Sequence, residues 1–227
     1  MRIFESIKKT MKKVIILGAS GLVGSEVLKL ALNNNEFDEV KIFVRKPLPI
    51  KNPKLTQILT NFDELDLIKS EINAEIIFCC LGSTKSKTPN LQDYKKIDHD
   101  YPLYFAKEGL KNNLSQFHII SALGANPNSS NFYTKLKGEI EDALKGINIP
   151  SLYIYRPSFL VGKRKEKRPL EKIALLIMRL INPLLMGRLK KYQTIDASII
   201  AKAMINESIK NKRGIFVLES DKIKELA

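Results

Sequence analysis

Short apolar runs alternate with longer amphipathic stretches along most of this chain. The runs are rich in β-branched and aliphatic residues and end at turn-forming residues, which is typical of buried strands. They lie at residues 14–17, 40–44, 55–59, 75–81, 117–121 and 151–155, with an edge strand predicted at 214–218. Strands that alternate with helical patterns in this rhythm predict a doubly wound parallel sheet of the α/β class.

The helical patterns lie between these runs, where apolar residues recur at the spacing of one helix face. Such patterns follow Gly21 and occupy residues 63–72, 91–113, 131–144 and 197–209. An aspartate precedes the last of them, and Asp196 is therefore predicted to be its N-cap. The long stretch at 91–113 is predicted to be interrupted near Tyr101 and Pro102.

A glycine-rich turn joins the first predicted strand to the first helix. Gly18, Gly21 and Gly24 permit, in order, a sharp turn, a close backbone approach to a phosphate, and tight packing of helix on strand. The first N–H groups of a helix have no intrahelical partner and attract an anion, so a pyrophosphate fits there. The spacing is looser than the usual dinucleotide fingerprint, and a tight turn that binds nothing is the alternative. The predicted cofactor-binding residues of this turn are Gly18, Ser20, Gly21, Leu22 and Val23.

The end of the second strand indicates which dinucleotide binds. Arg45 and Lys46 follow this strand, and a cation there accommodates the 2′-phosphate of NADP(H). Asp38 is at the sequence distance expected for an acid that selects NAD(H), but it precedes the strand and so lies at the wrong end. We therefore predict NADP(H) over NAD(H), although Arg-Lys before a proline is also an ordinary solvated strand exit.

Two further strand ends complete the predicted cofactor site. Ligands of open α/β sheets bind outside the carboxyl ends of the strands, where the strand order reverses. Leu81 and Gly82 end the central strand, and Pro157 and Ser158 follow the sixth. Small residues there allow a nucleotide to lie against the backbone.

Tyr133 and Lys137 are four residues apart on a predicted helix and therefore share one face. A lysine ammonium near a tyrosine hydroxyl favours the phenolate form, so the tyrosine can exchange a proton with a substrate oxygen while nicotinamide exchanges hydride. Lys137 can also hold the nicotinamide ribose. Ser121, at a strand end, is predicted to donate a hydrogen bond to the same substrate oxygen. In a lysine-rich chain one such pair is expected by chance, and the alternative is a half-buried tyrosine with a lysine beside it.

These motifs, taken in order, resemble the short-chain dehydrogenase/reductase superfamily. The narrower resemblance is to the atypical Tat-interacting-protein-like oxidoreductases, and it covers residues from about 12 to about 205. It rests on Cys-Cys-Leu-Gly at 79–82, Asp98-x-Asp-Tyr-Pro102, Ser121-Ala-x-Gly-Ala125 and Tyr133-x-x-x-Lys-Gly-Glu139. The resemblance implies a Rossmann fold, NADPH as cofactor, and Ser121, Tyr133 and Lys137 as the catalytic trio.

Composition bounds the organisation of the chain. Its 227 residues suit one domain over 12–227, preceded by an extension at 1–11, with a lid over about 158–192 that covers the substrate cleft. A basic run at 163–168 precedes an apolar stretch that continues to 189, and an anionic bilayer is the alternative partner of this 163–190 region. Two free cysteines and no secretory signal indicate a reducing compartment, and we predict a cytoplasmic protein.

The net charge of +14 is high, but the cations are spread from end to end, so no specific nucleic-acid partner is predicted. No metal site is predicted: Asp98, His99 and Asp100 are consecutive, and consecutive helical side chains do not converge. His118 lies near the beginning of its predicted strand, far from the carboxyl end where ligands bind, so we assign it to the core.

The function predicted from these features is an NADP(H)-dependent oxidoreductase that acts on a small carbonyl or alcohol. A regulator that binds NADPH without catalysis is one alternative. A sugar-nucleotide epimerase, which holds NAD tightly, is another that Arg45 disfavours. The oligomeric state stays open.

Overall fold

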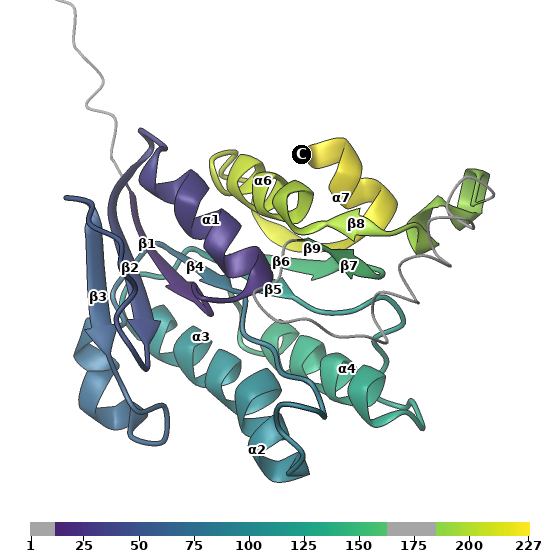
Figure 1. The fold of residues 1–227 in the computed structure, drawn as a ribbon, viewed down its shortest axis with the longest axis horizontal. Helices are drawn as coiled ribbons and strands as arrows, with labels where there is room; N and C mark the ends of the chain where they lie inside the picture. Colours follow the sequence, from purple (N-terminus) through teal and green to yellow (C-terminus); the bar gives the residue numbers. More distant parts are fainter. Residues whose placement is uncertain (1–11, 163–184) are drawn as a thin grey trace, which may run out of the picture.

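A parallel sheet of seven strands forms the centre of the protein (Figure 1). The computed structural model describes residues 12–162 and 185–227. The strands lie in the order β3-β2-β1-β4-β5-β6-β9, and each neighbouring pair is parallel. Their bounds are β1 Lys12–Leu17, β2 Phe37–Val44, β3 Leu55–Leu59, β4 Ile76–Cys79, β5 Gln116–Ile120, β6 Ser151–Arg156 and β9 Gly214–Glu219. The predicted Rossmann-like α/β fold is confirmed.

Helices cover both faces of this sheet (Figure 1). One face carries α1 (Leu22–Leu32), α6 (Ala197–Ser208) and α7 (Ser220–Leu226). The other carries α3 (Tyr101–Lys111) and α4 (Phe132–Lys145), with the 3₁₀ turn η1 (Leu65–Glu71) beyond β3. A small parallel pair, β7 (Leu160–Val161) and β8 (Ile195–Asp196), lies beside the main sheet. A further 3₁₀ turn, η4, spans Gly187–Tyr192.

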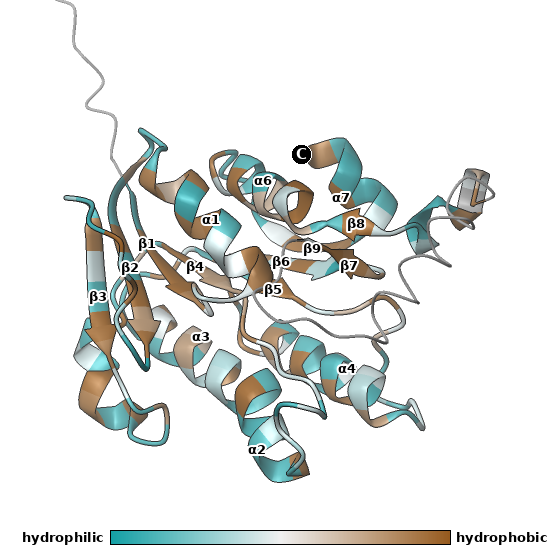
Figure 2. Ribbon diagram, viewed as in Figure 1, coloured by the Kyte–Doolittle hydropathy of each residue, from teal (hydrophilic) through white to brown (hydrophobic). Residues whose placement is uncertain are grey.

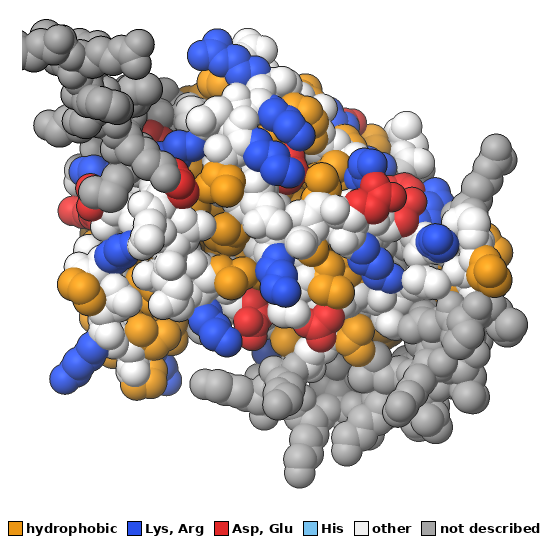
Figure 3. Space-filling view, turned by 90° about the horizontal axis from the view of Figure 1, so that it is seen from above, with side chains coloured by type: hydrophobic (Ala, Val, Ile, Leu, Met, Phe, Trp, Pro, Cys, Tyr) orange, Lys and Arg blue, Asp and Glu red, His pale blue; other side chains and the backbone are white. Residues whose placement is uncertain are grey.

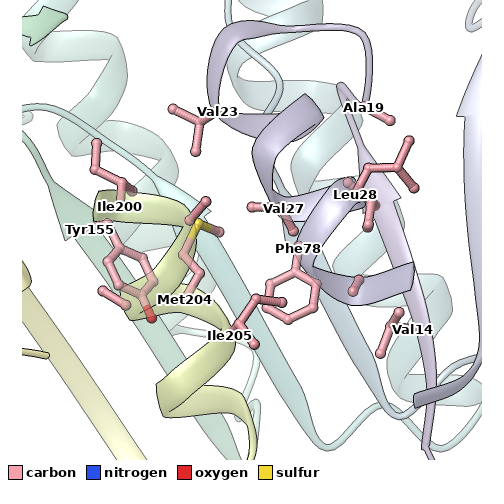
Figure 4. Packing of buried hydrophobic residues seen from close by; sticks show 14 of the residues in the cluster. Val14, Ala19, Val23, Val27, Leu28, Phe78, Tyr155, Ile200, Met204 and Ile205 are labelled. Atoms are coloured by element: carbon pink, nitrogen blue, oxygen red, sulfur yellow. The ribbon is translucent and has the colours of Figure 1, made fainter. Parts of the chain in front are cut away.

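The hydrophobic core divides into one cluster on each face of the sheet. Figure 4 shows Val27 of α1 facing Met204 of α6 above Phe78 and Tyr155 of the sheet. On the opposite face, residues of α3 and α4 such as Phe105 pack on the other sides of the same strands. The strands are accordingly apolar on both sides, and hydrophilic residues gather on the outer helix faces (Figure 2). This is why the strands read as unbroken apolar runs rather than alternating patterns.

The strand order reverses between β1 and β4. From β1 the chain moves outward to β2 and β3, and then crosses back to β4 and continues to β5 and β6. The carboxyl ends of β1 and β4 therefore open a crevice in which sheets of this type bind ligands.

The helical region before β5 is interrupted near Tyr101, as predicted, but by a change of helix type. It consists of α2 (Leu91–Lys95), a π-helical turn η2 (Lys96–Asp100) and α3, which begins at Tyr101. Pro102 lies in the first turn of α3, where its missing N–H is tolerated, because the π turn absorbs the change of hydrogen-bonding pattern. The predicted helix at 63–72 is the 3₁₀ turn η1, and the strand predicted at 75–81 is four residues long.

His118 lies in the core, as assigned. Its ring stacks on Tyr153 with centroids 4.4 Å apart, and its nitrogens contact the Tyr155 hydroxyl and the Gln116 side chain. Burial lowers the pKa of His118 to about 3, so the ring is neutral at physiological pH.

The predicted lid, extension and membrane-contact region lie largely outside the described residues, since 1–11 and 163–184 are not described. None of the helices in the described ranges is long and apolar enough to cross a bilayer. On the face formed by α1, α6 and α7, lysines and arginines are scattered among carboxylates and apolar side chains (Figure 3).

Candidate active site

The turn after β1 needs glycine at two positions for packing reasons. Gly18 has a φ of +74°, and a Cβ built on it would lie 2.6 Å from the Cys80 carbonyl oxygen. A Cβ on Gly24 would lie 2.1 Å from the Gly18 carbonyl oxygen. Both distances are shorter than any real contact, so a side chain at either position would push α1 away from β1 and β4.

The surroundings of Gly21 are less crowded than those of Gly18 and Gly24. A Cβ built there would meet the Gly18 carbonyl oxygen at 3.1 Å, and no other atom outside its chain neighbours lies within 4 Å among the described residues. Gly21 is the N-cap of α1, where no side chain caps the helix and no acidic residue lies in the first turn. The first N–H groups of α1, including those of Leu22 and Val23, therefore present uncompensated positive charge beside the exposed Ser20. The turn fits a pyrophosphate.

The end of β2 lies next to this turn. Leu17 pairs with Phe43, and the exposed Arg45 and Lys46 follow two residues later, alongside the glycine turn. Asp38 lies at the opposite end of the same strand, because Phe37 pairs with Lys12. A cation rather than an acid thus lies where a nucleotide ribose would extend from the turn.

The ends of β4 and β6 differ in the groups that are available to bind a cofactor. Leu81 is half-buried and Gly82 exposed just beyond β4, so backbone is accessible there. Pro157 is buried after β6. The hydroxyl of Ser158 donates to the Gln193 carbonyl, and its N–H donates to the Ser220 hydroxyl over 2.7 Å. Both donors of Ser158 are therefore used inside the protein, and the structure does not support its predicted cofactor contact.

Helix α4 brings Tyr133 and Lys137 to the carboxyl edge of the sheet. Asn131 caps the helix by accepting hydrogen bonds from the N–H groups of Tyr133 and Thr134. A Cβ on Gly138 would lie 2.2 Å from the Pro127 nitrogen, so only glycine lets α4 pack this closely on the loop after β5. Tyr133 is 39% exposed whereas Lys137 is only 4% exposed. The pair therefore combines an exposed tyrosine with a buried lysine.

An ion pair and a hydrogen bond hold the Lys137 ammonium. Its Nζ lies 2.8 Å from Asp98 Oδ1 and donates to the Ile120 carbonyl oxygen over 3.2 Å. Burial alone would lower the pKa of Lys137, but the Asp98 carboxylate, followed by Tyr133, outweighs it and raises this pKa above its ordinary value. Lys137 is charged throughout the physiological pH range.

Ser121 is placed differently from its prediction. It is 2% exposed, and its hydroxyl donates to Glu141 Oε1 over 2.5 Å. The Glu141 carboxylate also accepts from Arg156 Nε over 2.9 Å and from Arg156 Nη2 over 2.5 Å. Because the single hydroxyl proton of Ser121 goes to Glu141, Ser121 does not present a donor to a substrate oxygen in this structure.

Sequence reasoning missed Asp98 and Glu141 as parts of this site. Tyr133, Lys137 and Glu141 follow one another at intervals of four, and this spacing places all three on one face of α4. Asp98 carried a weaker signal, a carboxylate on a helix that covers the sheet. It is 1% exposed, whereas His99 turns outward to Asp100, so the three consecutive side chains do not converge. In the part of the chain that is described, no His, Cys, Asp and Glu side chains group as metal ligands.

Comparison with known proteins places the chain among nucleotide-binding families. Residues 13–93 match the family described as semialdehyde dehydrogenase, NAD binding domain. HTATIP2 of Rattus norvegicus is 32% identical over 178 residues, which cover 77% of this chain and 73% of that protein. The mitochondrial protein fmp52 of Aspergillus niger is 29% identical over 220 residues, 94% of each protein.

Solved structures share the fold at low sequence identity. WbmH of Bordetella bronchiseptica, solved in complex with NAD+, superposes with a TM-score of 0.69 and 19% identity over 95% of this chain and 78% of that one. The UDP-N-acetylglucosamine 4-epimerase of Methanobrevibacter ruminantium gives a TM-score of 0.68 and 20% identity over 92% and 76%.

These comparisons contradict the predicted cytoplasmic location, because the FMP52 relatives are named as mitochondrial proteins. The prediction rested on two free cysteines and on the lack of a recognisable secretory signal. Burial raises the pKa of Cys79 to about 12 and that of Cys80 well above its ordinary value. Such thiols form little thiolate and stay unpaired for a local reason, so they do not identify a compartment.

Proposed function

The chain belongs to the family of the HTATIP2 and FMP52 proteins, and we propose that it is an NADP(H)-dependent oxidoreductase that acts on a small carbonyl or alcohol. The family assignment confirms the resemblance to an atypical, NAD(P)-binding member of the short-chain dehydrogenase/reductase type. The observation that carries the proposal is the placement of exposed Tyr133 and charged Lys137 on one face of α4, at the same sheet edge as the glycine turn.

In this proposal each group has a separate task. Bound nicotinamide supplies or accepts the hydride. Tyr133 transfers a proton to or from the substrate oxygen at its exposed hydroxyl. Lys137 holds the nicotinamide ribose hydroxyls, and Gly21 with the start of α1 holds the pyrophosphate. The hydroxyl of Ser121 has lone pairs left after donating to Glu141, so it can accept a hydrogen bond but not polarise a carbonyl.

A test of the revised role of Ser121 is its replacement by alanine. We expect Ser121→Ala to reduce carbonyl turnover by no more than about tenfold, well below the factor of about 100 that a positioned proton donor contributes. Steady-state kinetics at saturating NADPH measure this. A loss of about 1,000-fold with unchanged nucleotide affinity would restore Ser121 as the donor to the substrate.

The preference for NADP(H) is proposed from the charge at the end of β2. Arg45→Asp is expected to weaken NADPH binding by about tenfold or more while sparing NADH, since the lost cation faces the 2′-phosphate. Calorimetric titration of both nucleotides measures the difference. Arg213→Asp, which makes the same charge change at the exposed amino edge of β9, is the control and should alter neither affinity. Equal weakening of both nucleotides by Arg45→Asp would remove Arg45 from the phosphate site.

A sugar-nucleotide epimerase is the second candidate, because two fold neighbours are an epimerase and a protein bound to NAD+. Such an enzyme would retain its nicotinamide through the reaction cycle and would convert UDP-N-acetylglucosamine without added cofactor. Incubation of the purified chain with that sugar nucleotide, followed by chromatography of the products, separates the two candidates. Arg45 favours the NADP(H)-dependent reductase.

A further inference from the structure

Asp98 is a carboxylate buried beside the candidate catalytic lysine. Its side chain is 1% exposed and that of Lys137 5%, with 2.8 Å between Oδ1 and Nζ. In the other ion pairs of the described residues at least one side chain reaches solvent: Arg156 is 23% exposed beside the buried Glu141, and Lys96 and Asp63 are 47% and 60% exposed. Removing two charges from water is costly, so a pair buried this completely calls for a reason beyond stability.

The second carboxylate oxygen of Asp98 connects this pair to the loop after β4, where we propose that the cofactor binds. Asp98 Oδ2 accepts a hydrogen bond from the Ser83 N–H over 2.8 Å, and a Cβ on Gly82 would lie 3.8 Å from Oδ1. The Tyr94 hydroxyl donates to the Ser83 carbonyl over 2.9 Å and fixes the same loop from α2. Asp98 thus connects the loop after β4 with α4.

The π turn η2 positions Asp98 next to Lys137. An inserted π turn rotates the residues that follow it relative to a regular helix, and such turns are frequent at functional sites. Asp98 lies in the middle of the turn and contacts Lys137, while Asp100 in the same turn is exposed.

We propose that Asp98 is a positioning residue that holds the Lys137 ammonium charged and directed at the cofactor ribose. The inference rests on the proposed function, because it assigns Lys137 to that ribose. Asp98 touches neither substrate nor cofactor in this scheme and acts through Lys137.

The charge of Lys137 depends on the groups around it. Asp98 from η2, Tyr133 from α4, Cys79 from β4 and Tyr94 from α2 face it. Of these, Asp98 is a carboxylate, whereas burial raises the pKa values of Cys79 and Tyr94, so these two groups are neutral at physiological pH. Without the Asp98 charge, burial favours the neutral amine, so the pKa of Lys137 falls. The ammonium would then be present only below that lowered pKa and lost as the pH rises.

The test is NADPH affinity as a function of pH in the full chain. Calorimetry between pH 6.5 and 9.5 is expected to show that deprotonation of Lys137 does not change the NADPH affinity of the wild-type protein in this range. In Asp98→Asn we expect affinity about tenfold weaker at pH 7, falling further as the pH rises. Asp100→Asn is the matched control, since it removes an exposed carboxylate from the same turn, and it should behave as wild type.

A double-mutant cycle distinguishes action through Lys137 from general damage. Lys137→Met should weaken NADPH binding, and adding Asp98→Asn should change it by less than about twofold, because the pair is already broken. The double variant also carries no unpaired buried charge, so it remains measurable if Asp98→Asn alone fails to fold.

Two results would overturn the inference while leaving the proposed function intact. One is an Asp98→Asn variant that binds NADPH as wild type at every pH. The other is an Asp98→Asn effect of equal size in the Lys137→Met background. A wild-type protein that binds neither NADPH nor NADH would instead refute the proposed function.

Discussion

Tyr133→Phe is expected to lower turnover of a carbonyl substrate by a factor of about 100 to 10,000 while NADPH affinity stays unchanged. The variant removes one hydroxyl and keeps the ring, which is 39% exposed and lies in the first turn of α4. Proton transfer is lost because no other group on that face of α4 can replace it: Lys137 is held by Asp98 and Glu141 by Arg156.

Two further variants serve as a control and a comparison for this measurement. Tyr104→Phe removes a hydroxyl that bonds to Asp66 on the outside of α3, and it should leave turnover unchanged. Lys137→Ala should lose both turnover and NADPH affinity, because the lysine also anchors the ribose. An active wild type whose Tyr133→Phe variant retains turnover would exclude Tyr133 as the acid. A wild type inactive on every carbonyl tried, with a silent Tyr133→Phe, would favour the NADPH-binding regulator.

Gly21→Val should weaken NADPH binding by more than about 100-fold and cost about 1 kcal/mol or less of folding stability. Its Cβ would lie 3.1 Å from the Gly18 carbonyl oxygen, next to the uncapped start of α1, where the phosphate is proposed to bind. The backbone at Gly21, with φ of −81° and ψ of 176°, is one that valine adopts readily.

Gly24→Ala is the matched contrast in the same turn. Its Cβ would lie 2.1 Å from the Gly18 carbonyl oxygen, so the variant should lose about 3 kcal/mol of stability or more even without nucleotide. Thermal melting with and without NADPH measures both effects. A Gly21→Val protein whose melting temperature still rises normally with NADPH would place the phosphate elsewhere.

The sequence was sufficient to predict the sheet and the glycine turn between β1 and α1. Strands buried on both faces leave unbroken apolar runs, and the run at 55–59 coincides with β3. Asp196 caps α6 by accepting from the Ser198 N–H, as its position before an apolar helical pattern predicted. Glycine was predictable at Gly18 and Gly24, because a positive φ at the first and a contact shorter than a Cβ allows at both leave no other choice.

The surroundings of the proposed catalytic residues were harder to predict from the sequence, because they depend on contacts between distant segments. Ser121 was predicted to be a free hydrogen-bond donor because it follows a strand. The buried carboxylate that accepts its hydrogen bond lies 20 residues later in the sequence. Asp98 was considered only as part of a family motif and as a rejected metal ligand, and the π turn that directs it inward leaves no periodic signal in the sequence. Ser158 is tied to Ser220, 62 residues away, which no local pattern reveals.

A crystal structure of the wild-type protein with NADPH would show whether the glycine turn and Tyr133 form one active site. We expect the pyrophosphate at the start of α1, the 2′-phosphate beside Arg45, and the Tyr133 hydroxyl within about 5 Å of nicotinamide C4, facing open space for a substrate. A Tyr133 hydroxyl turned away from C4, or a nicotinamide site filled by the chain's own leucine or isoleucine side chains, would contradict it.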